Sequence, residues 1–209
     1  MKFYNEDNDL SNFSSSFLSN PRNRFGSFAK GYFLAASRLA SHLLSSQSSF
    51  PDYEAYPVVF LYRHSLELYL KDILYKGNRL SEIADIDDIN SELYNNHKLS
   101  PLAEKASLVL QKKFPIDDDL RLFEKRLIQI VSEFQEIDPE SFSYRYPIDR
   151  KGEHSTSKSQ TVNLSAFSTN MNSLLEKMES IDFGFDVETE YALEKCAPEL
   201  GQALQEQYK

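Results

Sequence analysis

Apolar and aromatic residues recur every three or four positions over most of residues 24–181, and polar residues fill the positions between them. This period is typical of amphipathic helices that turn one apolar side toward a core. The expected helices cover 24–46, 56–77, 101–113, 116–137 and 164–181. The pattern therefore predicts an all-α fold, an up-and-down helical bundle of four to five helices.

The most regular period lies in 117–138. Its apolar residues alternate steps of three and four positions: Leu120, Phe123, Leu127, Ile130, Phe134 and Ile137. Three aspartates at 117–119 precede them, where negative charge favours the positive end of the helix dipole. Asp138-Pro139 is expected to end this helix, because the residue before proline avoids the helical conformation.

Two further helices have less regular patterns. In 24–46 we expect the apolar side to carry Phe28, Tyr32, Ala35, Leu39 and His42 or Leu43, while several alanines permit close helix approach. Pro57 is expected in the first turn of the next helix, where proline is tolerated. Ser100 and Pro101 form an N-cap and first-position pair for the third, which Phe114-Pro115 should end.

The remaining segments lack a helical period or stand apart from the bundle. Residues 1–23 are rich in Asn, Ser and Asp and predict a flexible or docking N-terminal arm. The stretch 142–164 alternates aromatic and polar residues in FSYRY and ends in β-prone QTVNL, which indicates a small hairpin or ordered loop. Residues 182–209 read as a C-terminal helical appendage, partly broken by Pro198 and Gly201.

The segment 56-YPVVFLYRHSLELYLKDIL-74 has an unusual mixture of residues. A helical projection places its apolar residues on one side: Val58, Val59, Tyr62, Leu66, Tyr69 and Ile73. Four polar residues form a stripe on the other side: Arg63, His64, Glu67 and Lys71. One interpretation is a solvated face, with Glu67 paired to Arg63 and Lys71 at i±4. The other follows from the large apolar residues interleaved with the stripe, which predict a cover made by the FSYRYP loop or a second subunit.

Composition excludes several classes of protein. The 209 residues carry a formal net charge of -9, which argues against a surface that coats nucleic acid or anionic membrane. The single Cys196 cannot form an internal disulfide, and no Cys/His cluster has zinc spacing, so we expect a cytoplasmic protein with no metal and no cofactor. The first residues lack a leader-like apolar region, and no apolar run approaches the roughly 18 residues of a membrane span.

Four segments together carry a family resemblance. The chain combines 61-LYRHSLELYLK-71, 97-HKL-99 at a helix start, and 142-FSYRYPIDRKG-152 followed by 161-TVNL-164. On an all-helical frame this combination resembles the HEPN-like domains of bacterial defence and toxin–antitoxin proteins, over residues 24–181. The resemblance implies a helical bundle, usually a homodimer, and in many members a metal-independent ribonuclease. Those members carry Arg, four to six residues, then His, a spacing that this sequence lacks.

The candidate catalytic residues are Arg63, His64 and Glu67. The unperturbed pKa of a histidine side chain lies near neutral pH, so His64 could act as a general acid or base, with Glu67 orienting it. The plainer interpretation makes His64 a structural hydrogen-bonding residue. Lys71 joins them on the same stripe as a candidate substrate-binding residue.

The other candidate substrate-binding residues lie outside the stripe. His97 could take part in the site or pin a loop at the following helix start. Arg145 and Tyr146 could grip a phosphate or stack on a base, but Arg145 could equally form an ion pair with Glu67, and this pairing is the one that we expect.

Two classes of function remain open. The first is a HEPN-like protein of a prokaryotic defence or toxin–antitoxin system that meets RNA or a nucleotide. The second is a non-enzymatic regulatory or protein-binding module on the same bundle, whose acidic surface meets a partner protein, which could be encoded nearby.

Overall fold

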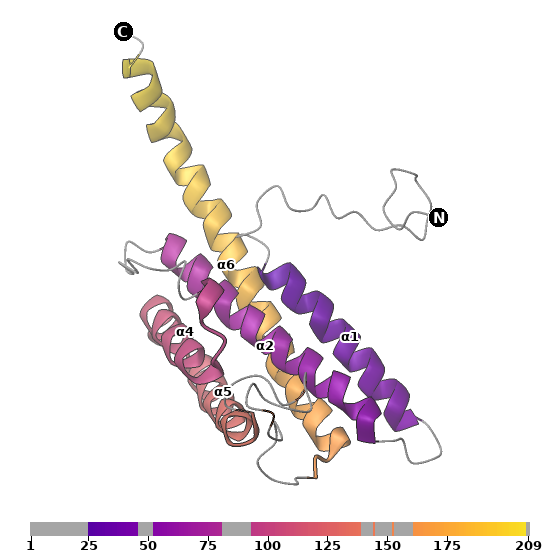
Figure 1. Cartoon of the computed structure of the whole chain (residues 1–209). Helices are drawn as coiled ribbons and strands as arrows, with labels where there is room; N and C mark the ends of the chain where they lie inside the picture. The colour runs from indigo at the N-terminus through magenta and orange to yellow at the C-terminus, as the bar shows by residue number, and fades with distance from the viewer. Residues whose placement is uncertain are drawn as a thin grey trace, which may run out of the picture.

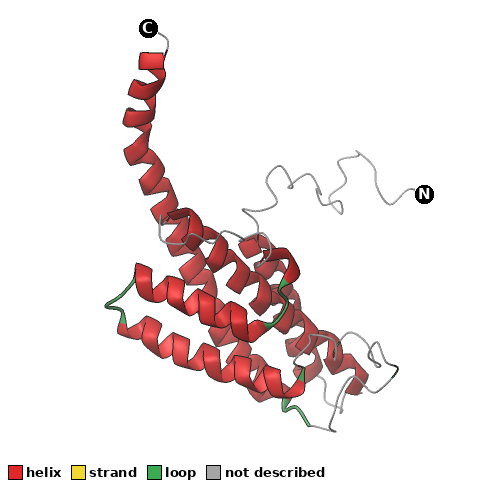
Figure 2. Ribbon diagram, turned by 60° about the vertical axis from the view of Figure 1, so that its left-hand side comes forward, coloured by secondary structure: helices red, strands yellow, loops and turns green. Residues whose placement is uncertain are grey.

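The computed structural model describes residues 25–45, 52–80, 93–138 and 161–207, together with Tyr144 and Gly152. Within these residues every regular element is a helix, and no strand is present (Figure 2). A short helical turn at 93–95 accompanies five longer helices: α1 (Phe25–Ser45), α2 (Asp52–Leu80), α4 (Leu99–Lys113), α5 (Asp118–Ile137) and α6 (Leu164–Gln207). The predicted all-α helical bundle is confirmed.

Helix α2 is the centre of the bundle and packs against α1, α4 and α6 (Figure 1). Helix α5 packs mainly against α4, which it follows after a short turn, and α6 also contacts α1. The predicted apolar side of α2 is confirmed, because all of its members are buried: Val58, Val59, Tyr62, Leu66, Tyr69 and Ile73. Tyr62 adds a polar contact to this core, since its hydroxyl donates to Asn172 Oδ1 of α6 at 2.6 Å.

Helix α1 is rotated by about one residue from the expected orientation. Its buried residues are Gly26, Ala29, Phe33, Ala36, Ala40 and Leu43, whereas the predicted core residue Phe28 is half exposed and His42 is exposed. Small residues on the contacting side let α1 approach α2 closely, and Ser65 of α2 donates to the Ala29 carbonyl at 2.8 Å. The side of α1 that packs on α2 is therefore the side with small residues, not the side that carries Phe28 and Tyr32.

Two predicted helix starts are wrong. Helix α2 begins at Asp52, so Pro57 lies beyond the first turn, while Asp52 and Glu54 place acidic charge at the positive helix end. Helix α4 begins at Leu99 with Lys98 as N-cap and no side-chain cap. The Ser100 hydroxyl, expected as the cap, donates instead to the Gln135 side chain of α5 at 3.2 Å.

Helix α5 follows the sequence prediction closely. Asp117 is its N-cap and accepts the Leu120 backbone N–H at 2.9 Å, and Asp118 and Asp119 occupy the first turn. The residues at three- and four-residue spacing are buried from Leu120 to Phe134, and Ile137 is partly buried. The backbone N–H of Asp138 closes the helix on the Phe134 carbonyl at 2.7 Å.

Helix α6 differs from the expected two segments, because it is continuous from Leu164 to Gln207 through Pro198 and Gly201. Its C-terminal part extends away from the other helices (Figures 1 and 2). Residues 161–163 of the predicted hairpin are irregular, Tyr144 lies in a turn, and Gly152 has a positive φ of 81°. The rest of that hairpin and the arm 1–23 lie outside the described residues.

Candidate functional site

The polar stripe of α2 is buried. Arg63, Glu67 and Lys71 are each only 3% exposed, so the interpretation as a solvated face is wrong. Burying three charged side chains is unfavourable unless they are paired and hydrogen-bonded to one another. The prediction that this polar face of α2 is covered, which was based on the large apolar residues between the charged ones, is confirmed for Arg63, Glu67 and Lys71.

Glu67 is the centre of this network. Its Oε1 accepts from Lys71 Nζ at 2.8 Å and lies 2.9 Å from His97 Nδ1, while its Oε2 accepts from Arg63 Nη1 at 3.3 Å. Three donors therefore converge on one carboxylate. The two i±4 contacts within α2 were predicted, and the third partner comes from the segment that precedes α4.

His97 connects the network to solvent. Its side chain is 58% exposed, against 4% for Glu67. The irregular residues 96–98 place it there: Asn96 Oδ1 accepts the Lys98 backbone N–H at 3.0 Å. Arg63 Nη2 donates to the His97 carbonyl at 3.1 Å, so both the ring and the backbone of His97 are bonded to the α2 network.

Asp138 completes the network from the end of α5. Its Oδ2 lies 3.7 Å from Arg63 Nε, and its side chain is 2% exposed. Tyr144 lies nearby: burial raises the pKa of its phenol, and the charge of Asp138 and the Tyr56 phenol raise it further. The network therefore holds two basic and two acidic side chains, a formally balanced set.

The environment keeps Glu67 ionised. Burial by itself would raise the pKa of this carboxyl, but the charge and hydrogen bond of Lys71, together with those of His97, leave the pKa below its ordinary value. An ionised Glu67 is a permanent acceptor at neutral pH. Lys71 and Arg63 are consequently internal partners that fix this carboxylate, and Lys71 does not reach the surface as a substrate-binding residue would.

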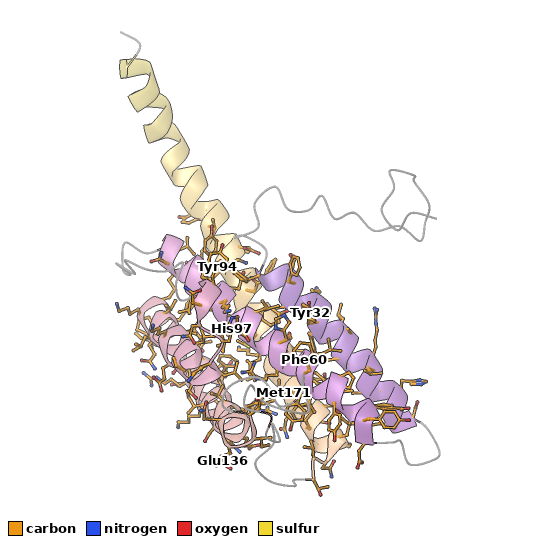
Figure 3. The ribbon with its side chains drawn as sticks, in the orientation of Figure 1. Tyr32, Phe60, Tyr94, His97, Glu136 and Met171 are labelled. Carbon is orange, nitrogen blue, oxygen red and sulfur yellow. The ribbon has the colours of Figure 1, made fainter. Side chains whose placement is uncertain are left out.

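His64 lies on a different side of α2. Its ring packs edge to face against Tyr32 of α1, with ring centres 4.5 Å apart, and stacks on Phe60 at 5.6 Å. Figure 3 shows Tyr32 and Phe60 toward α1 and His97 toward α4. One residue along a helix turns a side chain by about 100°, which accounts for the separation of His64 from Arg63.

The geometry supports one acid–base unit, the Glu67–His97 pair. When the His97 Nδ1–H donates to Glu67, the imidazole is held in one tautomer and its Nε2 becomes the proton-accepting atom. A carboxylate behind the ring also stabilises the imidazolium that forms when Nε2 takes a proton. Arg63 and Lys71 hold the Glu67 carboxylate in place by donating hydrogen bonds to it.

Sequence reasoning missed Asp138, which appeared only as a residue before a helix-ending proline. The end of α5 lies beside the start of α4 only in the packed bundle, so nothing in the local sequence indicated that Asp138 would contact Arg63. The expected ion pair between Glu67 and Arg145 stays a prediction, since Arg145 and Tyr146 lie outside the described residues.

Comparison with protein-family models, with curated proteins and with solved structures finds no match to this chain. In the described part of the chain, no group of three or more His, Cys, Asp or Glu side chains is arranged to hold a metal ion. Across the same residues, no helix has the length and apolar character needed to cross a membrane.

Proposed function

We propose that this chain is a HEPN-like protein of a prokaryotic defence or toxin–antitoxin system, and that its Glu67–His97 pair acts on RNA without a metal ion. The observation that carries the proposal is the 2.9 Å contact between a buried carboxylate and an exposed histidine. RNA cleavage of this type needs a base that removes the proton of the ribose 2′-hydroxyl. His97 Nε2 supplies that base, and the buried Arg63 and Glu67 hold it in position.

The test is cleavage of a short single-stranded RNA by the purified protein in the presence of a chelator. His97→Gln should lower the rate about 100-fold or more, which is the usual loss when a general base is removed. Glutamine can still donate to Glu67, so the fold should be retained. His42→Gln, on the exposed side of α1, is the matched control and should keep the rate. Equal rates in both variants would exclude His97 as the base.

The alternative is a non-enzymatic regulatory or protein-binding module. The net charge of -9 and the burial of Arg63 and Lys71 favour it, because neither basic side chain is exposed to meet a phosphate. In this case the wild-type protein shows neither RNA cleavage nor RNA binding, while the network contributes only to stability. A cytoplasmic location and a partner protein encoded nearby belong to both proposals.

The proposed assembly is a homodimer, as in the family that the sequence resembles. The apolar residues that interrupt the polar stripe of α2 predicted a cover, but His97 of the same chain lies over Glu67 of this stripe, so the stripe does not require a second subunit. Another apolar surface supports the proposal: Phe183, Val187 and Tyr191 recur every four residues on α6 and are exposed. They lie toward the part of the helix that extends from the bundle.

A further inference from the structure

Asp72 is a second buried acid on α2, about one turn further along the helix than Glu67. It lies where α2 packs against both α1 and α6. Asp72 is completely buried. Its Oδ1 accepts the backbone N–H of Gly26 in the first turn of α1 at 2.9 Å. Its Oδ2 lies 3.2 Å from Lys76 Nζ but has no hydrogen-bond donor. A buried carboxyl oxygen without a donor is expected to carry a proton of its own.

Three carboxyl groups share one lysine at this junction. Lys76 forms ion pairs with Asp72, with Asp182 and, at 2.6 Å, with Asp186. Asp182 and Asp186 belong to α6. Asp186 is 59% exposed, so its charge is solvated. If the more buried Asp72 and Asp182 were both ionised, Lys76 would balance only one of their two charges, which is unfavourable.

Gly26 allows the acids to come this close. A Cβ atom at position 26 would lie 2.6 to 2.9 Å from the Asp182 carboxyl group, too near for any real contact. Without a side chain at this position, Asp182 enters the space between the first turn of α1 and α2. Asp72 and Asp182 therefore both lie at Gly26, and both bind the ammonium group of Lys76.

The electrostatics agree with a shared proton. Burial raises the pKa of Asp72 to about 8, the neighbouring carboxyl group of Asp182 raises it further, and the charge of Lys76 and the Gly26 N–H oppose the rise. The other described groups around it are Tyr69 on α2 and, farther out, the ion pair of Lys30 on α1 with Glu179 on α6. Lys76 stays charged, because the three acids outweigh the effect of its burial and raise its pKa.

We infer that Asp72 and Asp182 share one proton, and that this carboxyl pair is a proton-dependent clamp that joins the first turn of α1 to α2 and α6. With the proton bound, Asp72 donates from Oδ2 to Asp182 while Oδ1 accepts from Gly26. When the proton leaves, Asp72 and Asp182 repel each other, and the junction is weakened. This clamp does not depend on the proposed RNA chemistry.

The test is urea unfolding of the full chain at pH 6 and pH 9. Because the folded protein binds the Asp72 proton more tightly than the unfolded chain, stability is complete at acid pH and falls as pH rises toward 8. The unfolding equilibrium constant of the wild type should rise roughly 100-fold between these two conditions through this one group. Asp72→Asn, which keeps both hydrogen bonds without a charge, should lose this rise. Asp118→Asn, at an exposed acid of α5, should keep it.

Carboxyl carbon NMR of aspartate-labelled wild-type protein provides a measurement that does not depend on a variant folding. One aspartate should titrate near pH 8, and its signal should be absent from Asp72→Asn. Asp182→Asn should move that titration to lower pH, because the neighbouring charge is gone. Complete ionisation of every aspartate below pH 6, or an unchanged pH dependence in Asp72→Asn, would overturn the clamp.

Discussion

Glu67 Oε1 lies 2.9 Å from His97 Nδ1, which joins a buried carboxylate to an exposed imidazole across two elements of the bundle. The carboxylate is fixed by Lys71 and Arg63, so the ring that it holds is fixed as well. A histidine that is oriented by a carboxylate on a rigid helix is the kind of arrangement that acid–base chemistry requires. The following predictions test the network, the packing around it and the assembly.

Glu67→Gln should destabilise the fold by about 3 kcal/mol, because removing one partner of a buried ion pair leaves the other charges uncompensated. Chemical unfolding measures the loss. Glu136→Gln, on an exposed face of α5, is the matched control and should change stability by less than about 0.5 kcal/mol. A loss at Glu67 as small as that of the control would mean that the network contributes little.

A double-mutant cycle on Glu67 and Lys71 should show strong coupling. Each single variant, Glu67→Gln and Lys71→Met, leaves a buried charge with fewer partners, whereas the double variant removes both charges. The double variant should therefore lose less stability than the sum of the single losses, by about 1 kcal/mol or more. Additive losses would show that the 2.8 Å contact is not a stabilising interaction.

Stability should also fall on acidification through Glu67. Its folded pKa lies below the ordinary value of 4.5, so its contribution is complete above that pH and is lost as pH falls through the folded pKa. Denaturation followed between pH 6 and pH 2 should show this acid loss in the wild type. Glu67→Gln should show a smaller loss over the same range, and an identical loss would contradict the sign of this pKa shift.

Four glycines in helices should divide into two pairs when changed to alanine. A Cβ at Gly77 would lie 2.2 Å from Val109 Cγ1, and one at Gly26 would meet Asp182, so Gly77→Ala and Gly26→Ala should destabilise. Gly31 and Gly184 have open space around them, and their replacement should stabilise by about 0.5 to 1 kcal/mol through helix propensity. Thermal melting of the four variants compares them directly. If all four variants changed the melting temperature in the same direction, the close contacts at Gly26 and Gly77 would be contradicted.

Light scattering should give the mass of a homodimer for the full chain. Val187→Asp places a charge in the middle of the exposed apolar stripe of α6 and should shift the protein toward the monomer. Leu122→Asp, at another exposed apolar residue on α5, controls for a general effect of added charge and should leave the mass unchanged. A monomeric wild type would remove the proposed assembly.

The periodicity of the sequence predicted the helices, the core side of α2 and the buried side of α5, because these features depend on local spacing. The burial of Arg63, Glu67 and Lys71 could also be inferred, since large apolar residues share their face. The sequence named His97 as a candidate residue but not as a partner of Glu67, and it did not name Asp138. His97 and Asp138 reach Arg63 and Glu67 only through tertiary packing, and nothing in their own neighbourhoods marks them as buried-network partners.

Two further differences have local physical causes. His64 neighbours Arg63 in sequence, but one helical step turns its ring toward Tyr32 and Phe60, so it does not belong with Arg63, Glu67 and Lys71 in one stripe. In α1, the choice of core side by residue size failed because Ala29, Ala36 and Ala40 pack closely on α2. Close helix contact favours small residues, which a pattern of large apolar residues does not detect.

Nitrogen NMR of the histidine rings tests the central claim most directly, namely that buried Glu67 holds exposed His97 with Nε2 as its proton-accepting atom. In the neutral wild-type protein the His97 signal should show the proton on Nδ1, and Glu67→Gln should weaken that preference. His42, exposed on α1, serves as the internal reference in the same spectrum. A His97 ring that carries its proton on Nε2, or that is indifferent to Glu67→Gln, would contradict the account.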